Sequence, residues 1–496
     1  MWFHSQLTTF QRKYLGRVLI FVALVRLVTL GAYPLADTTE ARYAEIAREM
    51  VATGNWITPQ VDGGVPFWGK PPLSIWAATA SFKAFGINEF GARFPSFVFA
   101  LIVAWLCYLM AERQYGHEQG LLAVMLLSTQ AIFFVVAGCV MTDPALVLGT
   151  TLSMVGFWRG LTETGFVGRM WGYLFFAGIA IGLLAKGPVA VVLSLFPVGV
   201  WVVWRNRWDS VWKGLPWISG SLLAIAISLP WYLLAEARTP GFLEYFLVGE
   251  HWKRFVESGW TGDLYGNAHS QPRGTIWLYW LLAAFPWSFV FVTRLLRLAR
   301  HGGTSNGMSF TDDRSVYLLL WTLTPMIFFT FAGNILWTYV LPGLPAFALL
   351  MAGMVPSAVD VRMGKALESK GGGAIIPLAG WTTPLVFVLV LSLSALGLIS
   401  TKKCHNHLVS RYECARTEKA SQLIYLFKRP YSAQFYTGGL AKRVTTLSEA
   451  ETFLDNKTQD FFAVKKSRFH KLPVTFRFRL ENLGEYAGYL LLRERV

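Results

Sequence analysis

Apolar runs close to the length of a membrane span recur through the first four fifths of the chain, and they constrain the fold more than any other feature. Hydrophobic residues make up 54% of the chain and charged residues 15%, which is more apolar surface than a water-soluble domain usually carries. A run of about 20 apolar residues crosses the hydrocarbon core of a bilayer as one helix. We therefore expect an all-α polytopic membrane protein with about 11–13 transmembrane helices. The runs that we interpret as spans lie at about 17–35, 94–111, 121–137, 145–160, 171–185, 188–204, 215–235, 275–295, 315–333, 336–354 and 376–399.

The basic residues are spread over short loops. The formal net charge of +16 therefore does not indicate a nucleic-acid partner. Loops on the N-terminal side carry about sixteen Lys and Arg and the opposite loops about ten, so the positive-inside rule places the N-terminus in the cytoplasm. The cations Arg12, Lys13 and Arg17 precede a long apolar run without a clear cleavage site, which we interpret as an uncleaved first span.

The first outer loop, about residues 36–93, has the densest charge in the N-terminal part of the chain. It contains Asp37, Glu40, Arg42 and Lys70 between strongly apolar flanks. Two carboxylates followed by cations at a membrane surface suit the handling of a lipid phosphate. The alternative is that these charges only solvate a loop.

Two short helices are expected in this loop. The stretch EARYAEIAREMVATG has apolar residues at helical spacing and ends at Gly54, which predicts an amphipathic helix on the membrane surface. Thr38 or Thr39 would cap its first turn. The apolar stretch 73–85 is too short to cross a bilayer and favours an interfacial or re-entrant segment.

Two later outer turns contain isolated charges. Asp143 precedes Pro144 at the start of a span, where it would act as a helix cap alone or have a further, functional role. Lys186 lies in AKGP, between two spans, where it would either snorkel to the surface or bind an anion. We favour the anion, because Gly187 and Pro188 predict a broken helix whose end lines a cavity.

The long loop 236–274 contains the motif GEHWKRF and several further cations. Its His251 and the later His269 would suit a metal, but their spacing follows no known ligand pattern. Tyr339, in another outer turn, is either an interface residue or a substrate contact. Arg26 lies inside the first span, where a cation requires a partner, and its neighbours in sequence do not supply one.

The tail from residue 402 onward is polar and of mixed pattern. The stretches LIYLFKRP, AQFYTGG, DFFAVKK and GYLLLRERV predict strands, and LSEAETFLD predicts a helix. We expect two domains, a transmembrane domain at 1–400 that carries the site and a small periplasmic α/β domain at 401–496. Cys404 and Cys414 lie close enough in sequence to pair in an oxidising compartment.

At these residues the chain resembles the polyprenyl-phosphate-sugar glycosyltransferases of the GT-C superfamily. It is most similar to the bacterial lipid A aminoarabinose transferases, and more distantly to the protein O-mannosyltransferases. The resemblance covers about residues 37–345 and rests on motifs in family order. They are TEARYAEIAREM, GNWITP, FWGKPPLSIW, GARFPS, MTDPAL, LLAKGPVA, EHWKRF and TYVLPGLP.

The resemblance implies an inverting glycosyltransferase of the bacterial inner membrane, with its active site in the periplasm. A sugar would move from a polyprenyl-phosphate donor to lipid A or another cell-envelope glycan. Asp37, Glu40 and Asp143 would be the catalytic carboxylates. The donor phosphate would bind Arg42, Lys70, Lys186 and Arg254, and the substrate cavity would include Tyr43, His251 and Tyr339. A divalent cation is a candidate cofactor, with no metal ligands assigned.

Two departures from the family pattern indicate that this chain belongs to a distinct branch of the aminoarabinose transferase relatives. Aminoarabinose transferases typically read D-E-x-R-Y, whereas this chain has Thr39 at the acidic position and Asp37 two residues earlier. They also read F-E-K-P, whereas this chain has Gly69 in place of the glutamate, which would remove a metal ligand. Asp37 is our choice for the carboxylate that orients the acceptor, and we expect neither Asp37 nor Lys70 to be structural.

Two other classes of function compete with a glycolipid-directed enzyme. A protein O-mannosyltransferase would use the same donor chemistry with a protein acceptor. A transporter or flippase for a lipid-linked sugar would need repeated spans, and the sequence shows no internal repeat.

Overall fold

The computed structural model describes residues 9–301, 312–354, 375–396, 398, 403–456 and 458–495. The chain divides into two compact units. The helical unit comprises Met1–Leu30, Phe67–Ser74 and Phe94–Leu389, and the mixed unit comprises Gly31–Pro66, Ile75–Arg93 and Val390–Val496. Most of the first outer loop therefore groups with the tail, whereas the predicted boundary at residue 400 had assigned it to the transmembrane domain.

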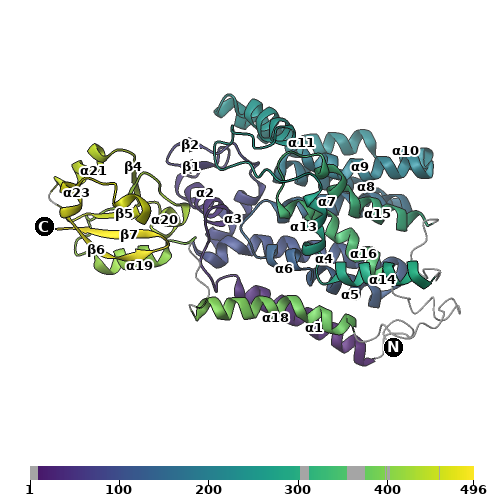
Figure 1. Ribbon diagram of the computed structural model, residues 1–496. Coiled ribbons are helices and arrows are strands. Elements are labelled where there is room, and N and C mark those ends of the chain that lie inside the picture. The colour runs from purple at the N-terminus through teal and green to yellow at the C-terminus, as the bar shows by residue number, and fades with distance from the viewer. Residues whose placement is uncertain are drawn as a thin grey trace. The chain divides into compact units, whose positions relative to one another are not determined.

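The helical unit is built almost entirely from helices (Figure 1). They are α1 (Thr9–Thr29), most of α4 (Glu89–Tyr115), α5 (His117–Ser128), α6 (Ala131–Val136), α7 (Asp143–Thr162), α8 (Gly165–Lys186), α9 (Val189–Arg205), α10 (Trp208–Gly214), α11 (Trp217–Arg238), the π-helix η1 (Glu244–Lys253), α12 (Arg254–Val256), α13 (Thr275–Ala283), α14 (Trp287–His301), α15 (Asp313–Thr330), the 3-10 helix η2 (Trp337–Gly343), α16 (Leu344–Gly353) and most of α18 (Ile375–Ala395).

Helices α7 and α8 pack against each other through small residues. A Cβ atom added at Gly149 would lie 2.5 Å from the backbone nitrogen of Gly182, and one at Gly178 would lie 2.5 Å from that of Ser153. Such an approach has room for glycine and not for a larger side chain. Small residues at helix contacts are the usual way in which helices associate where no water drives burial. At the start of α7, Asp143 also pairs with Lys186 at the end of α8.

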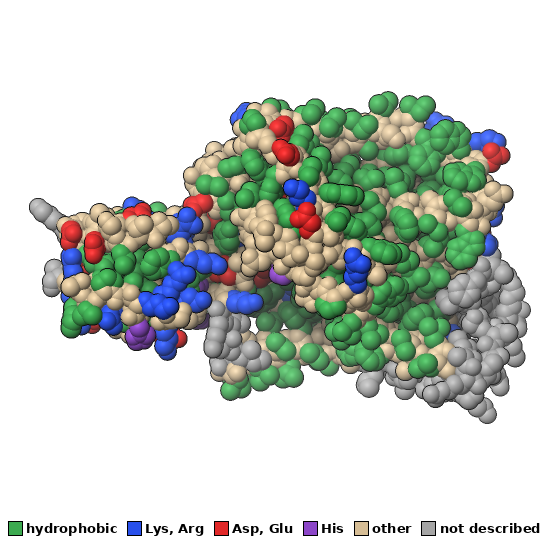
Figure 2. Space-filling view, turned by 45° about the horizontal axis from the view of Figure 1, so that its top comes forward, with side chains coloured by type: hydrophobic (Ala, Val, Ile, Leu, Met, Phe, Trp, Pro, Cys, Tyr) green, Lys and Arg blue, Asp and Glu red, His purple; other side chains and the backbone are tan. Residues whose placement is uncertain are grey.

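The structure supports a membrane-embedded chain. Among the described residues, α4, α8 and α11 are long and apolar enough to cross a membrane, and the bent pair α13 and α14 would make a fourth span. Hydrophobic side chains also cover much of the helical body in Figure 2. The larger count of about 11–13 spans stays a prediction.

Two predicted spans are broken helices. The run 275–295 forms α13 and α14, bent by 108°. Pro286 lies in the break and lacks the N–H that a continuous helix needs. The run 121–137 forms α5 and α6, which are separated by two residues. Hydropathy detects apolar length and does not detect such breaks.

Arg26, for which the sequence offered no partner, is buried among residues that are distant in sequence. Its Nη2 atom donates to the carbonyl of Val135 at 2.7 Å, and its guanidinium lies 4.9 Å from the ring centroid of Phe387. Carbonyl and aromatic groups from other helices thus offset the cost of this cation.

The mixed unit combines the first outer loop with a five-stranded sheet (Figure 1). Its sheet has the order β4-β3-β5-β7-β6, with β3 parallel to β4 and β5 and the other pairs antiparallel. Its elements are α2 (Thr39–Thr53), β1 (Gln60–Asp62), β2 (Val65–Pro66), α3 (Leu73–Phe85), α19 (Asn406–Ala415), β3 (Leu423–Leu426), α20 (Tyr431–Tyr436), β4 (Lys442–Val444), α21 (Leu447–Leu454), β5 (Phe461–Lys465), α22 (Lys466–Phe469), α23 (Val474–Phe478), β6 (Leu480–Tyr486) and β7 (Tyr489–Glu494).

The α/β character of the tail is confirmed, with one wrong element. β3, β5, β7 and α21 form where strands and a helix were predicted. AQFYTGG, predicted as a strand, lies mainly in helix α20, which begins after Pro430 and packs its buried side chains against α2. Neither Cys404, which is buried, nor Cys414, which is exposed, forms a disulfide.

The predicted amphipathic helix is confirmed as α2, and Gly54 ends it in the left-handed conformation. The predicted side-chain cap is wrong, because Thr38 takes the capping position without a side-chain hydrogen bond. The helix is also more buried than a surface helix should be. Even Glu45 and Arg48 are buried, and they pair through two hydrogen bonds of 2.7 Å.

Candidate active site

A pocket of about 380 Å³ opens in the helical unit, and it combines an apolar wall with a small set of charges. Its wall is formed mainly by side chains of α9, η1 and α15. The polar residues that line it are Lys70, Lys186, Glu250, His251, Arg254, Asn334 and Tyr339. Pockets that bind small molecules have this composition, with apolar walls and a few convergent polar groups.

Lys70 reaches the pocket from a short segment that is fixed by its neighbours. The backbone N–H of Trp68 donates to the hydroxyl of Tyr265 at 3.0 Å, and the Trp68 indole donates to Thr239 at 3.1 Å. A Cβ atom at Gly69 would lie 2.9 Å from the Phe67 ring and 3.3 Å from the Tyr265 ring. The glycine that replaces the family glutamate is therefore packed between aromatic rings, with little room for a longer side chain.

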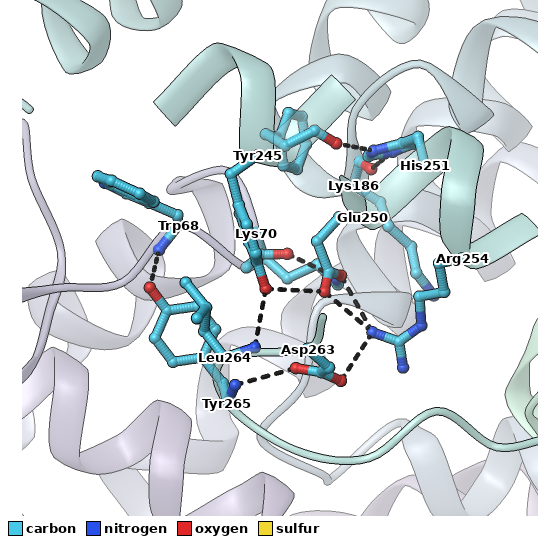
Figure 3. A network of polar contacts seen from close by, with 12 residues as sticks. Trp68, Lys70, Lys186, Tyr245, Glu250, His251, Arg254, Asp263, Leu264 and Tyr265 are labelled. Atoms are coloured by element: carbon cyan, nitrogen blue, oxygen red, sulfur yellow. Dashed lines mark hydrogen bonds and ion pairs between the residues drawn. The ribbon is translucent and has the colours of Figure 1, made fainter. Parts of the chain in front are cut away.

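Lys70 and Arg254 share one carboxylate, Glu250, as Figure 3 shows. The Lys70 ammonium donates to Oε2 of Glu250 at 2.7 Å, and Nη1 of Arg254 donates to both carboxylate oxygens at 3.1 Å. Arg254 also pairs with Asp263 at 3.2 Å, and the Tyr245 hydroxyl donates to Glu250 at 3.3 Å. Burial alone would raise the pKa of Glu250, but Lys70 and Arg254 lower that pKa to about 2. Glu250 is therefore ionised throughout the physiological range.

Lys186 enters the pocket from the end of α8, at the predicted helix break. Its ammonium donates to Oδ1 of Asp143 at 2.7 Å and lies 4.7 Å from the ring centroid of Tyr339. The prediction that this break lines a cavity is confirmed. Asp143 pairs with Lys186 and makes no side-chain cap of α7, which begins after Thr142.

His251 joins η1 to the end of α8. Its Nδ1 atom lies 2.7 Å from the carbonyl oxygen of Phe246, and its Nε2 atom lies 3.1 Å from that of Lys186. Burial lowers the pKa of His251, so we assign a neutral ring that donates to the nearer carbonyl. Both nitrogens thus face carbonyl oxygens, one of η1 and one of α8, and the ring is not arranged as a metal ligand.

The turn after Lys186 should accept only glycine. Gly187 has a φ of +85°, and an added Cβ atom would lie 2.6 Å from the Phe246 ring. Gly187→Ala should therefore destabilise the helical unit by about 1–3 kcal/mol, seen as a lower melting temperature in detergent. Gly199→Ala, where an added Cβ meets nothing within 4 Å, is the matched control. Equal melting temperatures for the two variants would contradict this account of the turn.

The candidate divalent cation stays a prediction. Within the described part of the chain, no three His, Cys, Asp or Glu residues are grouped to hold a metal ion. The pocket carboxylate Glu250 is engaged by cations, and so is Asp143. The suggested pairing of His251 with His269 is therefore not supported, because both nitrogens of His251 face carbonyl oxygens.

The remaining predicted site residues belong to the mixed unit. Asp37 accepts hydrogen bonds from the backbone N–H of Ser432, at 3.1 Å, and from the Ser432 hydroxyl. Burial raises the pKa of Asp37. The expectation that Asp37 is not structural is wrong, because it ties the outer loop to α20. Its catalytic role stays a prediction.

Glu40 is also held in place, by a buried arginine. Arg93 donates to both of its carboxylate oxygens, at 3.1 and 3.0 Å. Arg42 lies with its guanidinium carbon 5.3 Å from the ring centroid of Tyr43, which is buried in α2. The donor-binding role of Arg42 and the cavity role of Tyr43 stay predictions.

Sequence reasoning missed the partners that position the cations. Glu250 lies inside the motif EHWKRF, but its carboxylate was not singled out. Asn334 was missed as well, although its amide donates to the carbonyls of Arg254 and Glu257 at 2.7 Å and so fixes the backbone beside Arg254. The unusual density of charge in the motif was the available signal.

Comparison with solved structures defines the class of fold. The structure of ArnT from Cupriavidus metallidurans bound to undecaprenyl phosphate matches with a TM-score of 0.78 at 17% identity, over 96% of this chain and 98% of that chain. A family model described as dolichyl-phosphate-mannose-protein mannosyltransferase matches residues 16–246. The chain therefore has the fold of that ArnT structure.

Within that class, curated relatives confirm the particular resemblance. The undecaprenyl phosphate-alpha-4-amino-4-deoxy-L-arabinose arabinosyl transferase of Edwardsiella ictaluri is 31% identical over 358 residues, which are 71% of this chain and 61% of the relative. The corresponding transferase 1 of Pseudomonas fluorescens is 30% identical over 363 residues, 72% of this chain and 60% of the relative. The chain thus resembles the aminoarabinose transferases and spans about three fifths of the length of these relatives.

Proposed function

We propose that this protein is an inverting glycosyltransferase that moves a sugar from a polyprenyl-phosphate donor to lipid A or another cell-envelope acceptor. The pocket carries the proposal, since it places Lys70, Lys186 and Arg254 against an apolar wall within one cavity. A phosphate bound to a long isoprenoid chain needs this combination of cations and apolar surface. The proposed location is the bacterial inner membrane, with the N-terminus cytoplasmic and the pocket and tail periplasmic.

The cations have a direct role in the proposed chemistry. When the bond between the anomeric carbon and the phosphate oxygen breaks, its electron pair stays on the phosphate. Lys70, Lys186 and Arg254 would stabilise this growing charge, which is a transition-state effect. Asp143 orients Lys186, and Tyr339 covers the ammonium from the other side.

If the acceptor is itself a phosphate, the protein need not supply a base to activate it. An acceptor hydroxyl would need a carboxylate to orient it or take its proton, whereas a phosphate oxygen is already a nucleophile. Asp37 remains our choice for this carboxylate, with Glu40 and Asp143 as alternatives.

The acceptor can be identified by deleting the gene and comparing lipid A and surface glycans by mass spectrometry. Loss of a pentosamine from lipid A is the expected result if the aminoarabinose resemblance extends to substrates. Loss of a hexose elsewhere, with unchanged lipid A, would define a separate glycan-directed branch. Unchanged glycans with a sugar lost from exported proteins would support the second candidate, a protein mannosyltransferase, which the matching family model favours.

A further inference from the structure

Glu250 is an anion where the proposed ligand needs cations. Its side chain is 2% exposed and contacts Lys70 and Arg254, two of the cations proposed to bind the donor phosphate. A phosphate held by these cations must share them with this carboxylate. A residue that served only to bind phosphate would not be expected to compete with it.

The charges around the pocket balance. Lys186 pairs with Asp143, Lys70 pairs with Glu250, and Arg254 pairs with Glu250 and Asp263. These six groups carry three positive and three negative formal charges, and the buried ring of His251 adds none when neutral. An anion that enters the pocket therefore meets cations whose charge is already neutralised by neighbouring carboxylates.

The substrate and the product of the proposed reaction differ in charge. The donor is a phosphodiester with one negative charge. Transfer forms a bond from the acceptor oxygen to the anomeric carbon and breaks the bond to the phosphate oxygen, whose electron pair stays on the phosphate. The proton of an acceptor hydroxyl passes to the orienting carboxylate and from there to solvent. The released polyprenyl phosphate is a monoester whose second ionisation lies near pH 6, so it carries nearly two charges at pH 8.

We propose that Glu250 is a specificity-determining residue that weakens binding of the doubly charged polyprenyl phosphate relative to the singly charged donor, and so promotes product release. This inference rests on the proposed function. Repulsion by Glu250 scales with the charge of the phosphate, so it acts twice as strongly on a dianion as on a monoanion. At separations of several ångströms in a protein, one such charge changes affinity by about tenfold or more.

The test compares two lipids that differ in charge and only slightly in size. The probes are a C55 polyprenyl phosphate and its methyl ester, bound to the purified full-length protein in nanodiscs at pH 8. Glu250→Gln keeps the size of the side chain and removes its charge. It should tighten binding of the phosphate by about tenfold more than binding of the methyl ester.

Two variants serve as controls. Glu250→Asp keeps the charge. Its ratio of affinities for the phosphate and the methyl ester should therefore be closer to the wild-type ratio than that of Glu250→Gln. Glu163→Gln makes the same change just beyond the other end of α7, where Glu163 pairs with Arg159 and Arg113. The 20 residues of α7 span about 30 Å, so this variant should leave both affinities unchanged.

An equal loss of affinity for both probes in Glu250→Gln would show that the carboxylate only positions Lys70 and Arg254, and would overturn the inference. A wild-type protein that binds neither probe would overturn the proposed function, and the inference with it. If Glu250→Gln does not fold, the pH dependence of binding to the wild-type protein still tests the inference. Because the six charges around the pocket balance, its affinity for the phosphate should not fall between about pH 8 and pH 5, as the second charge is lost, and that for the methyl ester should stay level. A fall would contradict the inference.

Discussion

Lys70→Ala is expected to reduce sugar transfer by about 100-fold to 1000-fold, the usual cost of losing one group that stabilises the charge of a transition state. In the variant, Glu250 would keep Arg254 as its partner, so the pocket would lose a cation and retain the competing carboxylate. Transfer should be measured with wild-type and variant membranes that contain equal amounts of the protein.

Lys213→Ala is the matched control for this loss. Lys213 is 76% exposed and pairs with Asp209 on α10, away from the pocket lining. It should transfer sugar at the wild-type rate. Full activity of Lys70→Ala would show that the pocket is not the donor site, even though the fold would remain that of the transferases.

Arg93→Met is expected to destabilise the mixed unit by about 3–5 kcal/mol, because it removes a fully buried guanidinium that donates two hydrogen bonds to the carboxylate of Glu40. Arg93 has no exposed surface, and it donates to Glu40 and to the carbonyls of Tyr33 and Pro34 at 2.7 and 3.1 Å. The loop that carries Asp37 would lose its anchor. Thermal unfolding and limited proteolysis within residues 31–66 should both show the loss.

Arg113→Met makes the same change at a surface pair. Arg113 is 68% exposed and pairs with Glu163 at 3.1 Å, and such pairs contribute about 0–1 kcal/mol. The inference that Arg93 holds Glu40 in place fails if Arg93→Met and Arg113→Met lower the unfolding temperature equally.

For Asp37→Asn, stability must be measured together with activity. Asp37 accepts hydrogen bonds from Ser432, so a loss of activity alone would not distinguish a catalytic role from a structural one.

Local patterns predicted the elements that depend on local chemistry. Gly54 ends α2 because a residue without a Cβ atom adopts the left-handed conformation at little cost, and that preference is readable from the sequence. The break after Lys186 was readable for a similar reason. The breaks at residues 129–130 and 284–286 were not predicted, because their apolar runs continue on both sides.

The pocket was predicted in part. Lys70, Lys186 and Arg254 stood out because they lie in the motifs FWGKPP, LLAKGPVA and EHWKRF, and all three line one cavity. Their partners were harder to predict. Glu250 is 180 residues from Lys70, and Asp143 is 43 residues from Lys186. Only the folded chain brings these pairs within hydrogen-bonding distance.

The sequence by itself indicated a helical membrane protein with an α/β tail and a resemblance to glycosyltransferases, because apolar length, turn residues and motif order are local properties. Only the tertiary structure decided that Arg93 binds Glu40 and that Ser432 binds Asp37. It also decided that Glu250 pairs with two of the pocket cations. The physical reason is that the energy of a charge depends on its surroundings, and those come from residues that sequence order leaves far apart.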